Sequence, residues 1–324
     1  MEGIAARVPL TPDAEITLEA NPGAVDARAF AGFRAAGVNR LSIGVQSFRD
    51  DMLERIGRIH DAEAASGALR AARAAGFDNI NIDLMFGLPG DSPQGSEGDL
   101  ERAIALEPEH LSWYQLTIEP NTAFGRRAPA LPDDDEIAAI QDRGLERLER
   151  AGYARYEISA YALAGRECRH NLNYWEFGDY LGIGAGAHGK ITEPDGGILR
   201  TMKRRNPLSY LRAAGGTQAG TLEQVRAAEH RILEFALNAL RLTRGFGYEL
   251  FEERTGLPRA MLQAPVGEAL QAGLAEVSGG RVRASPKGLR YLNDLLLIFA
   301  AGERDRPRAA AYSGGPAVQV PIPR

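Results

Sequence analysis

Residues 37–48 have the sequence Gly-Val-Asn-Arg-Leu-Ser-Ile-Gly-Val-Gln-Ser-Phe, and this stretch decides the class of fold. Leu41, Ile43 and Val45 alternate with small or polar residues, a period that predicts a strand. The other strands expected on similar grounds are 14–19, 79–85 and 110–117. Because a helical pattern follows each of these strands, the sequence predicts an α/β fold with a parallel sheet, in the form of a full or partial (β/α) barrel.

The second half of the chain lacks this rhythm. A loop-like stretch rich in His, Asn, Tyr and Gly follows residue 160, and beyond residue 221 we expect two helices, a short hairpin and a closing helix. That order is compatible with a winged-helix-like module. The expected domains are a partial barrel with a loop motif over 1–205, a helical module over 206–302 and a disordered tail over 303–324.

The composition excludes several classes of protein. Of the 324 residues, 44% are hydrophobic and 25% are charged, which is ordinary for a globular protein. A net charge of −5 argues against binding nucleic acid by bulk electrostatics. Without an apolar run of about 18 residues or a signal-peptide layout, we expect a cytoplasmic protein. The single cysteine, Cys168, excludes an internal disulfide and a site built from several cysteines.

Each predicted strand of the first half ends in a polar residue. These residues are Glu19, Gln46, Asp83 and Thr117. Taken singly, any of them fits a cap or turn contact, but together they predict a shared site at the carboxyl edge of the sheet. Two acids, an amide, a hydroxyl and the nearby Arg58 suit a zwitterionic ligand that carries hydroxyl groups. The alternative for Arg58 is an ordinary surface charge.

Five segments of the sequence resemble one known family. They are Leu18–Gly23, Gly37–Phe48, Gly57–Arg58, Asn81–Pro89 and His170–Trp175. Together they resemble the radical S-adenosylmethionine haem chaperones of the HemW family, relatives of oxygen-independent coproporphyrinogen III oxidase. The resemblance runs from about Ala14 to Phe299. It implies a partial (β/α) barrel, S-adenosylmethionine at the carboxyl ends of the strands, a C-terminal helical module, and haem and haem-accepting proteins as partners.

The resemblance also assigns roles to the strand-end residues. Glu19, Gln46, Arg58, Asp83 and Thr117 sit where members of the family contact S-adenosylmethionine. Carboxylates suit the ribose hydroxyls and the ammonium group, whereas Gln and Arg suit the methionine carboxylate.

One feature of the family is not found in this sequence. The family holds a [4Fe–4S] cluster with a C-x-x-x-C-x-x-C motif on the first βα loop and carries a Gly-rich motif after the second strand, and neither motif is present. Cys168 cannot replace the missing ligands, because a cluster needs several thiolates at close spacing. We therefore expect a barrel without the first two strands of the family, and no cluster on this chain.

The segment His170-Asn-Leu-Asn-Tyr-Trp175 predicts a haem contact. His170 is the candidate iron ligand, with Tyr174 and Trp175 against the macrocycle. Arg166 and Arg169 are candidate partners for the haem propionates. The alternative is a loop histidine bonded to the backbone, with the two aromatic rings packed in a core. For Cys168, a buried and inert thiol is the expected state.

Two further motifs have structural interpretations. Gly184-Ala-Gly-Ala-His-Gly189 has the spacing of a dinucleotide loop, but it lacks the following helix, so close backbone approach is expected, with His188 as a lining residue. Asp133 and Glu136 are expected to form a capping box and no metal site.

The sequence thus favours a haem chaperone that binds haem and delivers it to acceptor proteins, including peripheral contact with membrane haem proteins. Two alternatives stay open. One is a radical enzyme of porphyrin biosynthesis similar to coproporphyrinogen III oxidase. The other is a relative without a cluster that acts only as a binding module.

Overall fold

The structure is a computed structural model that describes residues 1–24, 27–194 and 196–300. The chain forms two compact units, Met1–Arg169 and His170–Arg324, which are described in turn. The tail expected over 303–324 lies outside the described residues. The boundary expected at residue 205 remains a prediction.

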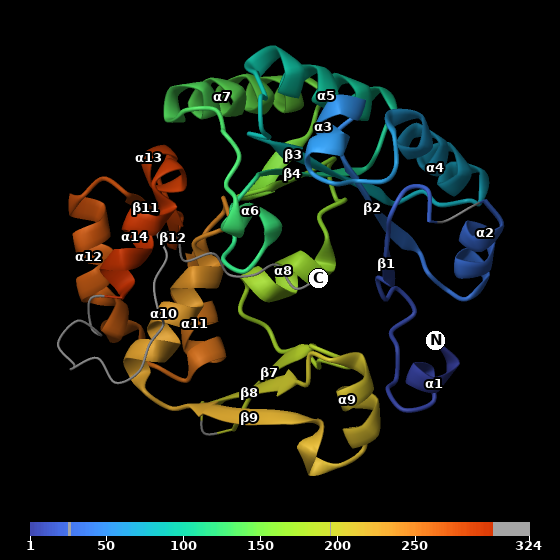
Figure 1. The fold of residues 1–324 in the computed structure, drawn as a ribbon. Helices are drawn as coiled ribbons and strands as arrows, with labels where there is room; N and C mark the ends of the chain where they lie inside the picture. Colours follow the sequence, from blue (N-terminus) through green and yellow to red (C-terminus); the bar gives the residue numbers. More distant parts are fainter. Residues whose placement is uncertain (25–26, 195, 301–324) are drawn as a thin grey trace. The chain divides into compact units, whose positions relative to one another are not determined.

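The first unit is built on a six-stranded sheet (Figure 1). In spatial order its strands are β1 (Thr17–Ala20), β2 (Arg40–Gln46), β3 (Ile80–Phe86), β4 (His110–Gln115), β6 (Ala160–Ala162) and β5 (Ala154–Glu157). The first four are parallel, as predicted, and β6 runs antiparallel to β4 and β5. With β1 and β5 at its two ends, the sheet is open, and the described residues form a partial barrel.

Helices precede, connect and follow the parallel strands of this sheet. They are α1 (Glu2–Ala5), α2 (Ala27–Ala35), α3 (Asp50–Arg55), α4 (Ala62–Ala74), α5 (Pro93–Ala105), α6 (Ala123–Arg126) and α7 (Asp134–Arg150). In Figure 1, α4, α5 and α7 lie along the outer side of the strands. The capping box expected at α7 is confirmed, since Asp133 Oδ1 accepts from the Glu136 amide at 2.8 Å and Glu136 Oε2 accepts from the Asp133 amide at 3.1 Å.

The two faces of the sheet differ in polarity. Residues such as Leu41, Ile82 and Leu111 are fully buried in the core with the helices. The other face carries Ser42, Asn81 and His110 side by side across β2, β3 and β4, with Asp83 and Ser112 paired one step further on. Because side chains alternate along a strand, the apolar period that predicts the core also places these polar groups together. This polar face is where the candidate site lies.

Close packing between α7 and β4 depends on one glycine. A Cβ atom on Gly144 would lie 1.9 Å from Cη2 of Trp113, so no larger residue fits there without movement. Trp113 is buried, and its ring lies 4.4 Å from that of Phe86. Gly144 therefore allows the helix to pack directly against the indole.

The second unit contains two antiparallel three-stranded sheets and a set of helices. Its first part comprises α8 (Arg169–Trp175), β7 (His188–Thr192), β8 (Ile198–Lys203), α9 (Pro207–Ala213), η1 (Thr217–Ala219) and β9 (Gly220–Val225). A loop-like stretch was expected here, and residues 176–187 do lie outside any named helix or strand. The expectation is wrong for α8 and for β7 to β9, where the glycines that suggest a loop instead let the strands approach closely.

The remainder of this unit is the predicted helical module. It comprises α10 (Ala228–Ala239), β10 (Phe246–Gly247), α11 (Tyr248–Thr255), η2 (Arg259–Leu262), α12 (Gln263–Gln271), β11 (Ala275–Ser278), β12 (Arg281–Ala284), α13 (Pro286–Arg290) and α14 (Leu292–Phe299). Its core includes the edge-to-face rings of Phe235, Phe246 and Phe251. No helix in the described ranges is long and apolar enough to cross a bilayer.

Candidate functional site

Gln46 ends β2 in an unusual backbone conformation. The pairing of β2 with β3 is irregular between Ile43 and Gln46, and the φ of Gln46 is 68°. The side chain is only 4% exposed, and its Oε1 accepts a hydrogen bond from the Tyr114 hydroxyl at 2.8 Å. A positive φ on a residue other than glycine costs free energy, so this hydrogen bond helps to hold Gln46 in place.

Glu19 and Asp83 interact electrostatically on the polar face. Asp83 accepts hydrogen bonds from Ser42 Oγ at 3.0 Å and from Asn81 Nδ2 at 2.8 Å. Burial raises the pKa of Asp83 in spite of these bonds. Partial burial and the negative charge of Asp83 also raise the pKa of Glu19. The structure therefore brings two of the predicted site residues into one electrostatic environment.

The other two predicted residues lie nearer the surface. Arg58 is exposed, and its Nη1 lies 3.5 Å from Oδ1 of Asn21, one residue beyond β1. Thr117 is half-buried, two residues beyond the end of β4. Arg58 is thus linked to the edge of the sheet that carries Glu19. That these five residues surround one ligand remains a prediction.

A buried charge network beside Gln46 was not predicted from the sequence. Arg49 Nη2 pairs with Asp91 Oδ1 at 2.8 Å, and Arg49 Nε pairs with Asp99 Oδ2 at 3.2 Å. Asp99 also accepts from Ser47 Oγ at 2.6 Å and from the Phe48 amide at 2.8 Å. Burial raises the pKa of Asp99 even though Arg49 opposes the shift.

The same network reaches the loop after β3. Asp91, whose side chain is fully buried, accepts a hydrogen bond from the Gly87 amide at 2.9 Å. Arg49 therefore joins the loop that follows β2 to the loop that follows β3. One hint of this network was present in the sequence, because Asp91 and Asp99 occur in a segment that also supplies buried helix residues. Their partner, Arg49, could not be identified from the sequence, since it lies more than 40 residues away along the chain.

His110 was also missed as a member of the polar face. Its Nδ1 lies 2.6 Å from Oδ1 of Asn81, and its Nε2 lies 2.9 Å from the hydroxyl of Tyr156. Because the amide nitrogen of Asn81 already donates to Ser42, its oxygen is the acceptor here, so His110 Nδ1 carries the proton and Tyr156 donates to Nε2. Burial and the charge of Arg40 lower the pKa of His110 well below 6.5.

His170 lies near the beginning of α8 and is exposed. Its ring is 4.7 Å from that of Tyr174, one helical turn later, and the Tyr174 ring is 4.3 Å from that of Tyr180. Burial is the main cause that raises the pKa of Tyr174 to about 12, so the phenol is neutral at physiological pH. An exposed imidazole beside a pair of packed aromatic rings is a suitable arrangement for a planar iron porphyrin.

The rest of the His170–Trp175 motif stabilises the local structure. Asn173 Nδ2 donates to the Asp179 carbonyl at 3.0 Å. Trp175 is buried, and the guanidinium of Arg241 lies 4.4 Å from the centre of its indole ring. These two residues shape the turn after α8, whereas His170 is exposed and the half-buried Tyr174 lies against it.

The residues that precede this motif have their own partners in the first unit. Cys168 is buried, and its Sγ donates to Glu15 Oε1 at 3.5 Å. Arg169 Nη1 pairs with Asp13 Oδ2 at 2.9 Å. Arg166 lines a polar pocket of about 280 Å³ together with these acids. The expected pairing of Arg166 and Arg169 with propionates remains a prediction.

The donor sets fit one implied cofactor better than the other. Carboxylates, an amide and an arginine match the hydroxyl, ammonium and carboxylate groups of S-adenosylmethionine. The sequence holds one cysteine, and the described residues contain no group of three or more His, Cys, Asp or Glu side chains placed to hold a metal ion. These residues do not fit a [4Fe–4S] cluster, which needs several thiolate ligands at close spacing.

Comparison with known proteins identifies the relatives of this chain. The Radical SAM superfamily matches residues 2–103, and the HemN C-terminal domain matches residues 227–291. The haem chaperone HemW of Escherichia coli is 48% identical over 303 residues, which cover 93% of this chain and 79% of that protein. HemW of Haemophilus influenzae is 43% identical over 303 residues, which cover 94% of this chain and 78% of its own.

A solved structure shows the same fold. It is the coproporphyrinogen III oxidase HemN of Escherichia coli, with a TM-score of 0.72 at 23% identity, covering 90% of this chain and 70% of that one. An identity this low supports the fold alone. The radical S-adenosylmethionine fold and the resemblance expected from the sequence are both confirmed, and this chain belongs to the HemW family of haem chaperones.

Proposed function

We propose that this chain binds haem and transfers it to acceptor proteins. The observation that carries the proposal is the exposed imidazole of His170 beside the ring of Tyr174, in a chain that is 48% identical to a haem chaperone. A neutral imidazole is a common axial ligand of haem iron. Because the ligand is exposed, an acceptor protein can approach the iron and replace it.

S-adenosylmethionine is the second proposed ligand, at the carboxyl edge of β1 to β4. Glu19 and Asp83 would accept hydrogen bonds from ribose hydroxyls or the ammonium group, and Gln46 and Arg58 would bind the methionine carboxylate. Thr117 would offer a hydroxyl at the end of β4. The support is the shared polar face of Glu19 and Asp83 and the fixed side chain of Gln46. When bound, S-adenosylmethionine supplies a cationic sulfonium centre.

The acceptors proposed are haem proteins, including membrane haem proteins reached from the cytoplasm by peripheral contact. We propose no oxidase activity, because the likeness to coproporphyrinogen III oxidase supports only the fold. A binding role without cluster chemistry is compatible with the single cysteine of this sequence.

Haemin titration of the purified chain tests the haem proposal. We expect a defined Soret shift with the wild-type protein, and His170→Ala should not give the wild-type spectrum. His230→Ala is the matched control, because His230 is also an exposed histidine on a helix. His60 and His110 are 7% and 0% exposed and should not contribute. An unaltered spectrum in His170→Ala would show that the motif is structural.

A further inference from the structure

A second histidine lies on an exposed row of side chains in the second unit. His188 on β7 pairs with Met202 on β8, and Met202 pairs with Thr221 on β9. All three residues are exposed, Met202 to 40%. The Lys203 amide donates to the Ala187 carbonyl at 2.8 Å, which makes His188 and Met202 a pair without mutual hydrogen bonds, the narrow kind with Cα atoms about 4.5 Å apart.

Two tyrosines connect this row to His170. The Tyr174 ring, which contacts His170, also packs against the Tyr180 ring at an interplanar angle of 47°. Tyr180 forms a backbone bridge with Lys190, and its hydroxyl accepts from Arg200 Nη1 at 3.1 Å. Lys190 and Arg200 face each other across β7 and β8, two residues from the His188–Met202 pair and therefore on the same face of the sheet. Ring contacts thus lead from His170 to Tyr180, whose backbone pairs with Lys190, and His188 lies two residues from Lys190 along β7 in the same unit.

The backbone on either side of His188 is fixed. Lys190 is 1% exposed, and its Nζ donates to Asp179 Oδ1 at 2.8 Å. Burial alone would raise the pKa of Asp179, but the hydrogen bonds from Lys190 and Thr192 lower it. A Cβ atom on Gly182 would lie 2.0 Å from the His188 carbonyl oxygen, so the preceding segment lies directly against β7. His188 is therefore an accessible imidazole on a rigid support.

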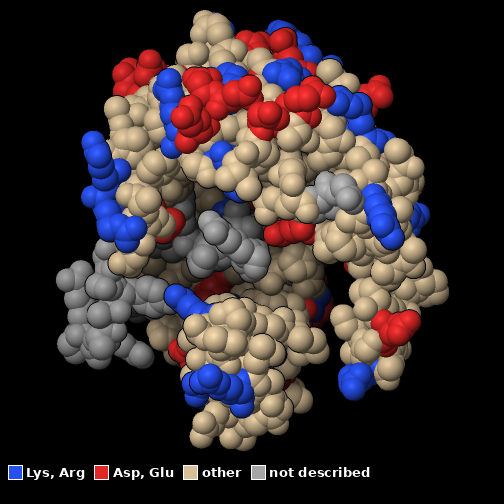
Figure 2. Space-filling view, turned by 45° about the vertical axis from the view of Figure 1, so that its right-hand side comes forward, with Lys and Arg blue, Asp and Glu red and all other residues tan. Residues whose placement is uncertain are grey.

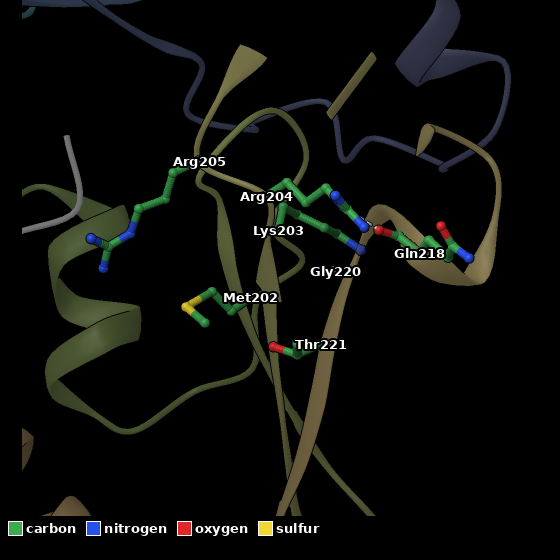
Figure 3. A pocket seen from close by; sticks show the side chains of 7 residues that line it. All are labelled: Met202, Lys203, Arg204, Arg205, Gln218, Gly220 and Thr221. Atoms are coloured by element: carbon green, nitrogen blue, oxygen red, sulfur yellow. Dashed lines mark hydrogen bonds between the residues drawn. The ribbon is translucent and has the colours of Figure 1, made fainter. Parts of the chain in front are cut away.

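Cations gather at the same end of this sheet. Residues 196–222 contain five Lys or Arg and no Asp or Glu. A pocket of about 420 Å³ there is lined by Met202, Lys203, Arg204, Arg205, Gln218, Gly220 and Thr221 (Figure 3). In Figure 3, Met202 and Arg205 extend to one side of β8 and Lys203 and Arg204 to the other. Figure 2 shows this end of the molecule at the bottom of the view, tan and blue with little red.

Of these cations, Arg205 best suits a propionate beside His188. Arg204 Nε already donates to the Gln218 carbonyl at 2.6 Å. Arg205, two residues beyond the end of β8, is exposed and extends in Figure 3 to the same side as Met202, the partner of His188. An imidazole, a thioether and a guanidinium on one surface match the iron, the apolar macrocycle and the carboxylates of haem.

We propose that His188 is the second axial ligand of the haem that His170 binds, with Met202 against the macrocycle and Arg205 paired with a propionate. This inference rests on the proposed haem function and extends it to the opposite side of the iron. Two imidazole ligands make the iron six-coordinate and low-spin. Met202 projects from the same face as His188, so it packs beside the imidazole and does not ligate the iron.

The test is a haemin titration of the full chain, followed by absorbance and electron paramagnetic resonance spectra. We expect one low-spin haem per wild-type chain. His188→Ala should give a five-coordinate, high-spin haem with an affinity lower by about tenfold. Added imidazole should restore the low-spin spectrum. His188→Gln, which keeps a polar side chain of similar reach, should behave like His188→Ala, and His230→Ala should behave like the wild type.

Iron-free protoporphyrin separates the two parts of the proposed site. Arg205→Gln should weaken binding of both haemin and protoporphyrin, whereas His188→Ala should weaken only haemin binding. A low-spin spectrum that persists in His188→Ala overturns the assignment, and so does a stoichiometry of two haems per chain. Failure of His170→Ala to change the spectrum would instead overturn the proposed function, so the two failures are distinguishable.

Discussion

The Tyr114 hydroxyl donates a hydrogen bond to Oε1 of Gln46 at 2.8 Å, and this bond joins the end of β2 to β4. Gln46 is held with a φ of 68°, so the position of its side chain depends on the partner. If Gln46 binds the carboxylate of S-adenosylmethionine as proposed, Tyr114 acts as a positioning residue for it. The two strands are not neighbours, because β3 lies between them.

Tyr114→Phe should therefore weaken the binding of S-adenosylmethionine. One neutral hydrogen bond contributes about 1 kcal/mol, which corresponds to a loss of affinity of about fivefold. Saturation-transfer NMR, which detects weak binding, measures the change. Tyr210→Phe is a control in the second unit, where the hydroxyl contacts the Gly184 amide. Equal affinities of Tyr114→Phe and the wild type would contradict the role of Gln46.

Asp83→Asn should separate ligand binding from stability. Since burial raises the pKa of Asp83 above 3.8, ionisation of this carboxyl costs free energy in the folded state at neutral pH. The variant removes that cost but loses one acceptor for Ser42 or Asn81. We expect its free energy of unfolding at pH 7 to stay within about 1 kcal/mol of the wild type.

The same variant should bind S-adenosylmethionine at least about tenfold more weakly, because a charge-assisted hydrogen bond is lost. Urea denaturation at several pH values checks the first part. Any stability gained by the variant should disappear as the pH falls toward 3.8, because the wild-type carboxyl then becomes protonated and is uncharged like the amide of the variant. A loss of several kcal/mol at pH 7 would show that Asp83 is structural.

His110 should make the first unit sensitive to mild acid. Its pKa in the folded protein lies well below 6.5, whereas the unfolded chain binds a proton near that pH. The stabilising effect is complete above pH 6.5 and is lost as the pH falls toward the folded pKa, at about 1.4 kcal/mol per pH unit.

His110→Gln, which keeps a donor and an acceptor, should therefore show a smaller decline in stability between pH 7 and pH 5.5 than the wild type. The raised pKa values of Glu19 and Asp83 act in the opposite direction in more acidic solution, and they are common to both proteins. Denaturant titrations of both proteins between pH 7 and pH 5.5 measure the free energy of unfolding that tests this prediction. Parallel pH profiles would mean that His110 is protonated in the folded state.

Gly144→Ala should destabilise the protein. The added methyl group would meet the indole of Trp113 at 1.9 Å, and overpacking of this kind costs about 1–3 kcal/mol. Gly98→Ala on α5 is the matched control, since nothing lies within 4 Å of its Cβ position. There the gain in helix propensity should stabilise the protein by up to about 1 kcal/mol. Thermal unfolding of the two variants should give shifts of opposite sign.

The parallel strands could be predicted from the sequence because apolar residues alternate with small or polar residues along each strand. Leu41, Ile43 and Val45 need no knowledge of partners to indicate a strand. The antiparallel strands β7 to β9 could not be predicted in this way, because glycines at 182, 189 and 220 weaken the pattern. These glycines let neighbouring backbones approach closely, and only the structure shows which backbones those are. A Cβ atom on Gly220, for example, would lie 2.4 Å from the Met202 carbonyl oxygen.

The site residues also fall into those that the sequence could predict and those that depend on partners far away along the chain. Gln46 ends β2, and that position follows from the order of elements, so sequence reasoning found it. Asp83 was expected to end its strand as well, but it lies in the middle of β3, because the strand continues to Phe86. The partners of Arg49 could not be found, because Asp91 and Asp99 become neighbours only when two βα loops fold together. The tautomer of His110 likewise depends on Asn81 and Tyr156, from two other strands.

The ion pairs of Arg49 have a consequence for the speed of local opening. Because Arg49 ties the loop after β2 to the loop after β3, neither loop can open without breaking bonds to the other. The Phe48 and Gly87 amides, both bonded to carboxylates of this network, should exchange with solvent deuterium at closely similar, slow rates. A ligand that binds at this edge then pays little conformational entropy, since the surface it meets became ordered when the chain folded.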